Sequence, residues 1–260
     1  MIDGLKNEVA GLREAWRSID RQTAFVLLFA ALAVILQMQF GDRSFFRRTF
    51  GQVAEEPWNG LWGWGWWFGM QGLLGFVLPV AILRFGFGRT AAEMGLSAGD
   101  WRFAGRLALL YLPLVVVGTW VLSAGDDFLS HYPHYQPAAN DWTVFVIYEA
   151  LFLFYWMGWE YLWRGFVLFG TAPRLGLYAI FVQAMPFALL HYNKPLSEAL
   201  LSIVGGVAIG ALVWRARSFW IAVPIHAAQM LVLDLWATLR IRSGVRGIGP
   251  EALIEMLRSF

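Results

Sequence analysis

Seven long apolar runs constrain this chain more than any other feature of its sequence. They cover residues 23–40, 61–83, 104–123, 143–170, 175–191, 199–214 and 221–238. The hydrocarbon core of a bilayer is about 30 Å thick, and about 20 helical residues cross it. Backbone polar groups must be paired in lipid, and the alternating pattern of a membrane barrel is missing, so we expect helices. The sequence predicts an all-α polytopic membrane bundle of about seven to eight transmembrane helices, with a short or surface-lying helix near residues 250–260.

The composition excludes several classes of protein. Of the 260 residues, 58% are hydrophobic and 15% are charged, whereas a soluble domain carries about 25% charged residues. The formal net charge is only +2, and the basic residues flank the apolar runs without forming a patch, so no nucleic-acid partner is expected. Because the chain has no cysteine, disulfides, thiolate metal sites and cysteine nucleophiles are excluded.

The polar segments suggest how the bundle lies in the membrane. Residues 1–22 are polar and charged, so we interpret the first apolar run as a retained anchor and not as a cleaved signal peptide. Segment 124–142 contains three aspartates and neither Lys nor Arg, which favours the outer side of the membrane. Basic residues at 84–106 and 215–217 favour the cytoplasmic side, whereas arginines after the first run and in the tail oppose this orientation. A cytoplasmic N-terminus is the favoured interpretation.

A few ionisable residues interrupt the apolar runs. Such groups are costly in hydrocarbon and are functional candidates by default. The candidates taken from among them are Glu149, Glu160, Arg164, His191 and His226. Each also has a purely structural interpretation, either as a self-neutralising pair four residues apart on one helix face or as a packed histidine. A functional site is favoured because three separate predicted helices each contribute such a group.

Helix lengths test whether these groups can meet. If the fourth and fifth helices turn near residues 171–174, Glu160 and His191 differ in depth by roughly 7 Å, which tilt and side-chain reach can close. Glu149 lies roughly 10 Å from the level of His191 on the other side and fits the same cavity less well. His226 is expected to lie at a shallower level, unless the start of its helix near Pro224 is irregular.

A carboxylate and a neutral imidazole beside one water form a general-base pair. A second histidine can donate a hydrogen bond to the developing oxyanion. The same side chains, Glu160, His191 and His226, could instead hold a divalent metal such as zinc. The sequence contains no His-Glu-x-x-His motif, which excludes a standard zincin.

Three segments resemble the motifs of the CPBP family, the type II CAAX prenyl protease and bacteriocin-processing group, formerly called Abi. Glu160-Tyr-Leu-Trp-Arg164 is similar to the family's Glu-Glu-x-x-x-Arg, and Phe187-Ala-Leu-Leu-His191 matches Phe-x-x-x-His. His226-Ala-Ala-Gln-Met230 matches the start of His-x-x-x-Asn. The stretch from His191 to Glu198 also looks like the usual continuation in bacterial members. The resemblance covers roughly residues 143–234.

The resemblance implies an intramembrane peptidase of the glutamate type, in a group often classed with the metalloproteases. In this interpretation Glu160 or a near neighbour activates water together with His191. Arg164 orients the carboxylate, and His226 and the residue four later stabilise the oxyanion. Two positions depart from the family: Trp159 stands where the first Glu is usual, and Met230 stands where Asn is usual. Secondary candidates are Glu149, Gln229 and Asn193.

We therefore expect a multi-pass protein of the cell membrane, a prokaryotic inner membrane by analogy with bacterial members. It would cleave a membrane-associated or C-terminal segment of a protein substrate. The alternative is an inactive relative that acts as a membrane scaffold, a peptide-binding protein or an immunity-type partner. The favoured mechanism requires no cofactor, although a metal remains open. Expected partners are membrane lipid, a protein or peptide substrate and a further membrane protein. Along the chain we expect a polar segment at 1–22, three helices over 23–123, a catalytic core over 143–238 and an amphipathic tail over 239–260.

Overall fold

A computed structural model describes the backbone of residues 2–259 and the side chains of residues 8–259. Within residues 2–259 every regular element is a helix, and there is no strand. Six helical stretches are long and apolar enough to cross a membrane. They are Arg21–Phe40, Trp58–Gly86, Trp101–Leu122, Trp142–Leu175, Leu196–Ala216 and Phe219–Ser243. This confirms the predicted all-α polytopic bundle.

The fifth apolar run forms a helix shorter than the sequence suggests. Helix α10 covers only Tyr178–Leu189, 12 residues, because Gly176 ends the preceding helix with a φ of +55° and residues 190–194 form turns. A glycine adopts such a positive φ without the steric cost that other residues meet. The bundle therefore has six long helices and one short apolar helix within the described residues, close to the predicted number.

The remaining elements complete the bundle and its flanks. Three of the long stretches are single helices: α2 (Arg21–Phe40), α6 (Trp101–Leu122) and α11 (Leu196–Ala216). The second stretch joins α4 (Trp58–Gly72), η1 (Leu73–Val77), α5 (Leu78–Ala81) and η2 (Ile82–Gly86). The fourth joins α8 (Trp142–Glu160), η4 (Tyr161–Val167) and α9 (Leu168–Leu175), and the last joins η5 (Phe219–Ile221) and α12 (Ala222–Ser243). The flanking elements are α1 (Ile2–Arg17), α3 (Arg43–Phe50), α7 (Asp126–His131), η3 (Gln136–Ala139) and α13 (Pro250–Arg258). Helix α13 lies where the short eighth helix is predicted.

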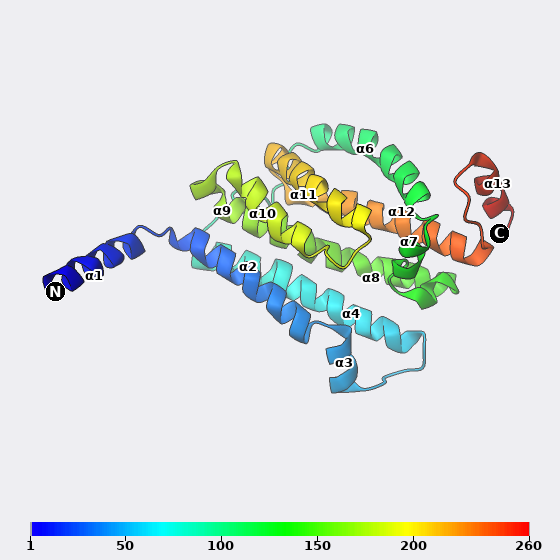
Figure 1. The fold of residues 1–260 in the computed structure, drawn as a ribbon, viewed down its shortest axis with the longest axis horizontal. Helices are drawn as coiled ribbons and strands as arrows, with labels where there is room; N and C mark the ends of the chain where they lie inside the picture. Colours follow the sequence, from blue (N-terminus) through cyan, green and yellow to red (C-terminus); the bar gives the residue numbers. More distant parts are fainter. Residues whose placement is uncertain (1, 260) are drawn as a thin grey trace.

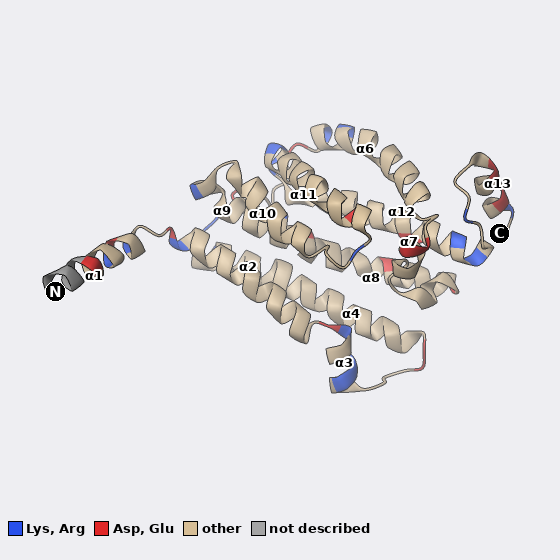
Figure 2. Ribbon diagram, viewed as in Figure 1, with Lys and Arg blue, Asp and Glu red and all other residues tan. Residues whose placement is uncertain are grey.

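Helix α8 is the central element of the bundle. It packs against α4 on one side and α12 on the other, while α10 packs against α11 and α6 against α12. Figure 1 shows α6 curved over the outside of this bundle and α1 extending away from it. Lys, Arg, Asp and Glu lie mostly at helix ends and in the flanking segments, and the long helices are otherwise almost free of them (Figure 2). This distribution is the one a membrane-spanning bundle requires.

Two glycines allow α4 and η1 to approach α8 closely. A Cβ atom on Gly75 would overlap the backbone carbonyl of Gly158, and a Cβ atom on Gly158 would overlap the backbone carbonyl of Gln71. Small residues at helix contacts of this kind allow backbones to approach in lipid. The contact lies just before Glu160 and so fixes the position of the helix that carries it.

Candidate functional site

Glu160 and Arg164 form an ion pair inside the central helix. Glu160 is the last residue of α8, and Arg164 lies in the π-helical turns of η4 that continue the same rod. The Arg164 guanidinium donates to Glu160 Oε1 at 3.1 Å, and both side chains are fully buried. π-Helical turns occur frequently at functional sites. The structure thus places a carboxylate and its counter-ion at the junction of α8 and η4, where both side chains are buried.

His226 meets the same carboxylate from another helix. It lies in the second turn of α12, after the short 3₁₀ turn η5. Its Nδ1 atom is 2.6 Å from Glu160 Oε1, and its ring stacks on that of Trp156 at 4.1 Å between centroids. The sequence suggested a shallower level for His226; the structure brings it to the level of Glu160. Three of the predicted site residues, Glu160, Arg164 and His226, therefore converge.

His191 lies beside this group without a direct hydrogen bond to it. It follows the end of α10, and its Nδ1 atom is 2.7 Å from the carbonyl oxygen of Phe187. The Phe187 ring lies 4.6 Å from the ring of His191 and 6.1 Å from that of His226, and Arg164 covers it at 4.0 Å. Burial lowers the pKa of His191 to about 4, so its imidazole is neutral at pH 7.

The two positions that depart from the family motifs are both filled by packed apolar side chains. Trp159 and Met230 are buried. The Trp159 ring lies 6.5 Å from the ring of His191 and lines a narrow pocket between α2, α4 and the end of α10. Glu160 is therefore the carboxylate that this chain presents beside His226.

The secondary candidates lie apart from Glu160. Gln229 accepts a hydrogen bond from Tyr111 of α6 at 2.8 Å, and Asn193 is exposed in the loop after α10. Glu149 lies about three helical turns before Glu160, where its carboxyl group faces Asp234 of α12. The structure thus groups Glu149 with a different set of polar residues.

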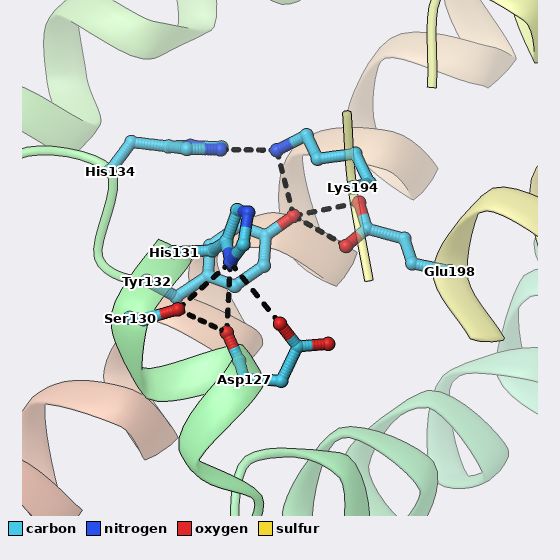
Figure 3. A network of polar contacts seen from close by, with 7 residues as sticks. All are labelled: Asp127, Ser130, His131, Tyr132, His134, Lys194 and Glu198. Atoms are coloured by element: carbon cyan, nitrogen blue, oxygen red, sulfur yellow. Dashed lines mark hydrogen bonds and ion pairs between the residues drawn. The ribbon is translucent and has the colours of Figure 1, made fainter. Parts of the chain in front are cut away.

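Apart from Glu149, the members of that second set were not among the predicted site residues. Tyr132, after α7, donates to both carboxylate oxygens of Glu198 at 2.7 Å. The Lys194 ammonium donates to Tyr132 Oη at 2.9 Å and also contacts His134 Nε2. Figure 3 shows these side chains converging, with His131, Ser130 and Asp127 beside them. Burial raises the pKa of Tyr132 and lowers that of Lys194.

One signal in the sequence could have found this cluster. Asp234 is an ionisable residue within the last apolar run, and it is fully buried in α12. The loop residues Tyr132 and His134 carry no such signal, because their role depends on how the loop folds back over the bundle.

The donor set around Glu160 does not fit a metal ion. Among the residues that the structure describes, no group of three or more His, Asp and Glu side chains lies close enough to hold one. Glu160 Oε1 is already contacted by Arg164 and by Nδ1 of His226, and a guanidinium beside a carboxylate competes with a cation. We derive no catalytic step through a metal.

One protein-family model matches the stretch of sequence that contains these residues. Residues 139–232 match the family model described as Rce1-like, type II CAAX prenyl endopeptidase Rce1-like. The matched segment contains Glu160, Arg164, His191 and His226, and it confirms the resemblance drawn from the motifs. Comparison with curated proteins and with solved structures gave no match.

Proposed function

We propose that this multi-pass membrane protein is an intramembrane endopeptidase, which cleaves a membrane-associated or C-terminal segment of a protein substrate. The observation that carries the proposal is the contact of 2.6 Å between His226 Nδ1 and Glu160 Oε1. These residues come from different membrane helices, and both are buried. A buried carboxylate that holds an imidazole is the arrangement by which hydrolases orient and charge a catalytic histidine.

The two histidines have different roles in the proposed reaction. The Glu160 carboxylate accepts from the Nδ1–H group of His226 and so orients the ring, and the mechanism requires a doubly protonated ring whose Nε2–H group donates to an oxyanion. His191 donates its Nδ1–H to the Phe187 carbonyl, and this leaves Nε2 of the neutral ring as an acceptor. His191 is therefore the base that we assign to the attacking water.

The proposed reaction is peptide hydrolysis without a covalent intermediate. His191 Nε2 removes a proton from water as the water oxygen forms a bond to the scissile carbonyl carbon. The resulting oxyanion accepts a hydrogen bond from His226 Nε2–H. The C–N bond then breaks, and His191 returns the proton to the leaving amine. Arg164 keeps Glu160 ionised throughout, because an adjacent cation favours the carboxylate.

The proposal assigns partners as well as chemistry. It requires a protein or peptide substrate that reaches the site from the surrounding membrane lipid, and it requires no cofactor. We place the protein in the cell membrane, a prokaryotic inner membrane by analogy. The free second oxygen of Glu160, Oε2, has no hydrogen-bond partner among the described residues, which supports a polar group or water of the substrate complex at this point.

A non-catalytic peptide-binding or scaffold protein is the second candidate. It is favoured by the complete burial of Glu160 and by the presence of Trp159 at the usual position of the first Glu. In this case the ion pair with Arg164 would hold the helices together, and the protein would bind a membrane peptide without cutting it. A further membrane protein would then be its partner.

One experiment separates the two candidates. The full chain is reconstituted in liposomes with a pool of membrane-anchored peptides that carry tags at both ends, and the products are read by mass spectrometry. We expect wild-type protein to cut a subset of the pool, and Glu160→Gln, His191→Ala and His226→Ala to abolish cutting. His131→Ala, at a partly exposed histidine, is the matched control.

The outcomes are distinct. Cutting that persists in all three site variants refutes the peptidase assignment. Capture of peptides without cutting by the wild type supports the second candidate. Loss of cutting on addition of a chelator, restored by zinc, would refute the metal-free mechanism alone.

A further inference from the structure

A second pair of carboxyl groups, one fully buried and one partly buried, joins the helices that carry Glu160 and His226. Asp234 of α12 is fully buried, and its carboxyl group lies within hydrogen-bonding reach of Glu149 on α8. In the described part of the chain no N–H or O–H donor reaches Glu149 Oε1 or either carboxyl oxygen of Asp234. The peptidase site does not use this pair.

Two ionised carboxylates cannot share such a place. Both oxygens of Asp234 and Oε1 of Glu149 are shut off from water, and two negative charges at this place would repel each other in a medium of low dielectric constant. A single proton held between them removes one charge and supplies the missing donor, so that one carboxyl group donates to the other. Such a pair takes up and releases its protons as a unit.

Other ionisable groups face this pair from the neighbouring elements. Lys194, in the loop before α11, and Glu198, in the first turn of α11, are both bonded to Tyr132 Oη. The Lys194 ammonium attracts the Asp234 carboxylate and the Glu198 carboxylate repels it. Tyr148 of α8 and Tyr132 after α7 contribute phenol groups, and the hydroxyl group of Tyr148 has no partner among the described residues.

The remaining neighbours do not supply a counter-ion for the pair. Helix α4 contains no ionisable side chain, and Tyr111 of α6 is bonded to Gln229. Arg43 of α3 lies over the Trp64 ring at 3.8 Å and faces Tyr148. His131 and Asp127 of α7 contact each other, with Asp127 mostly exposed. Lys194 bonds to Tyr132 and not to the pair, so a proton is the means left for neutralising one of the two carboxylates.

We propose that Glu149 and Asp234 share a single proton, and that this contact positions the catalytic histidine. Helices α8 and α12 then touch through polar groups at two levels, Glu160 with His226 and Glu149 with Asp234. The levels are about 16 Å apart along α8 and about 12 Å apart along α12, at about 1.5 Å per residue. Two contacts between the same pair of helices fix the distance of α12 from α8 and the rotation of α12 about its own axis. They therefore also fix the distance from Nδ1 of His226 to Glu160.

The shared proton makes the fold sensitive to alkali. The folded chain holds this proton at neutral pH, whereas the unfolded chain releases it, so folding takes up a proton and stability falls as the pH rises. The contact between the carboxyl groups stands without any assumption about activity. Its role in catalysis rests on the proposed peptidase function.

The test compares two replacements of Glu149 with the wild type. In Glu149→Gln the amide N–H donates to the Asp234 carboxylate permanently, so the hydrogen bond remains but its proton no longer dissociates. In Glu149→Ala the Asp234 carboxylate is left buried and unpaired. Asp234→Asn provides the reciprocal amide variant. Thermal unfolding in detergent micelles is followed from pH 6 to pH 10 for each protein.

We expect the melting temperature of the wild type to fall by several degrees across this range, beyond the fall seen in Glu149→Gln and Asp234→Asn. The Ala variant should be less stable than the wild type at pH 6. Lys194 interacts electrostatically with Asp234, so the comparison is repeated in a Lys194→Met background, where the titration of this lysine is absent. Equal alkaline losses in the wild type and both amide variants would overturn the shared proton.

Histidine NMR supplies the readout for positioning. The chain has only four histidines, so ring-labelled protein gives resolvable signals, and the Nδ1 proton of His226 in its short bond to a carboxylate should resonate far downfield. We expect this resonance to persist in Glu149→Gln and to be lost in Glu149→Ala, whether or not a substrate is ever found. An unchanged resonance in Glu149→Ala would refute the positioning role, while absence of cutting in every protein would bear on the peptidase proposal alone.

Discussion

Replacing Arg164 with methionine should destabilise this protein far more than the loss of an ordinary ion pair. Arg164 lies 3.1 Å from Glu160 Oε1 with both side chains fully buried. With an effective dielectric constant of about 20, the attraction between two unit charges at this distance is about 5 kcal/mol. Breaking a buried pair by removing one partner typically costs about 3–5 kcal/mol, because the other charge stays buried.

A double-mutant cycle isolates the contribution of the pair. Arg164→Met, Glu160→Gln and the double variant are unfolded by added SDS in mixed micelles, and the free energy of unfolding is followed by circular dichroism. Glutamine still accepts from His226, so this contact survives in all variants. We expect Arg164→Met to cost about 3–5 kcal/mol and the double variant to cost markedly less than the sum of the single changes.

The chain contains a matched control for this cycle. Arg89 and Glu93 have the same spacing of four residues and the same distance of 3.1 Å, but their side chains are 33% and 48% exposed. Water and salt screen such a pair, so its coupling should be several-fold smaller and should vanish in high salt. A coupling between Glu160 and Arg164 no larger than that of the exposed pair would refute the view that both carry charge in a dry interior.

Three further outcomes are expected. Gly158→Val should cost on the order of 1–3 kcal/mol, because the new side chain would overlap the Gln71 carbonyl; an unchanged unfolding free energy would contradict the close helix approach. Lys194→Met should expose the loop after α10 to limited proteolysis, since the ammonium holds this loop to Tyr132 at 2.9 Å; a cleavage rate equal to that of the wild type would count against the anchor. Because burial lowers the pKa of His191 to about 4 and the base must be unprotonated, cutting should persist from pH 7 down to about pH 5 and fail near pH 4; a loss already complete at pH 6 would exclude His191 as the base.

Much of the candidate site could be predicted from the sequence because charged residues are rare in apolar runs. Glu160, Arg164 and His226 stand out for that reason, and the structure brings them into contact. The position of Glu149 could not be predicted in the same way. Its depth follows from helix rise, but its partner Asp234 depends on the rotation of α12 about its axis.

The sequence by itself determined the helical membrane-spanning architecture, because lipid leaves a backbone no other way to pair its polar groups. The lengths of the apolar runs determined the approximate number of helices. The ionisable residues inside those runs determined the candidate acid and bases. Only the tertiary structure decided which of these groups meet. Side-chain contacts between helices depend on the tilt and rotation of each helix and on the close approach that Gly75 and Gly158 permit. For the same reason, the loop cluster of Tyr132 and Lys194 emerged only once the chain had folded back on itself.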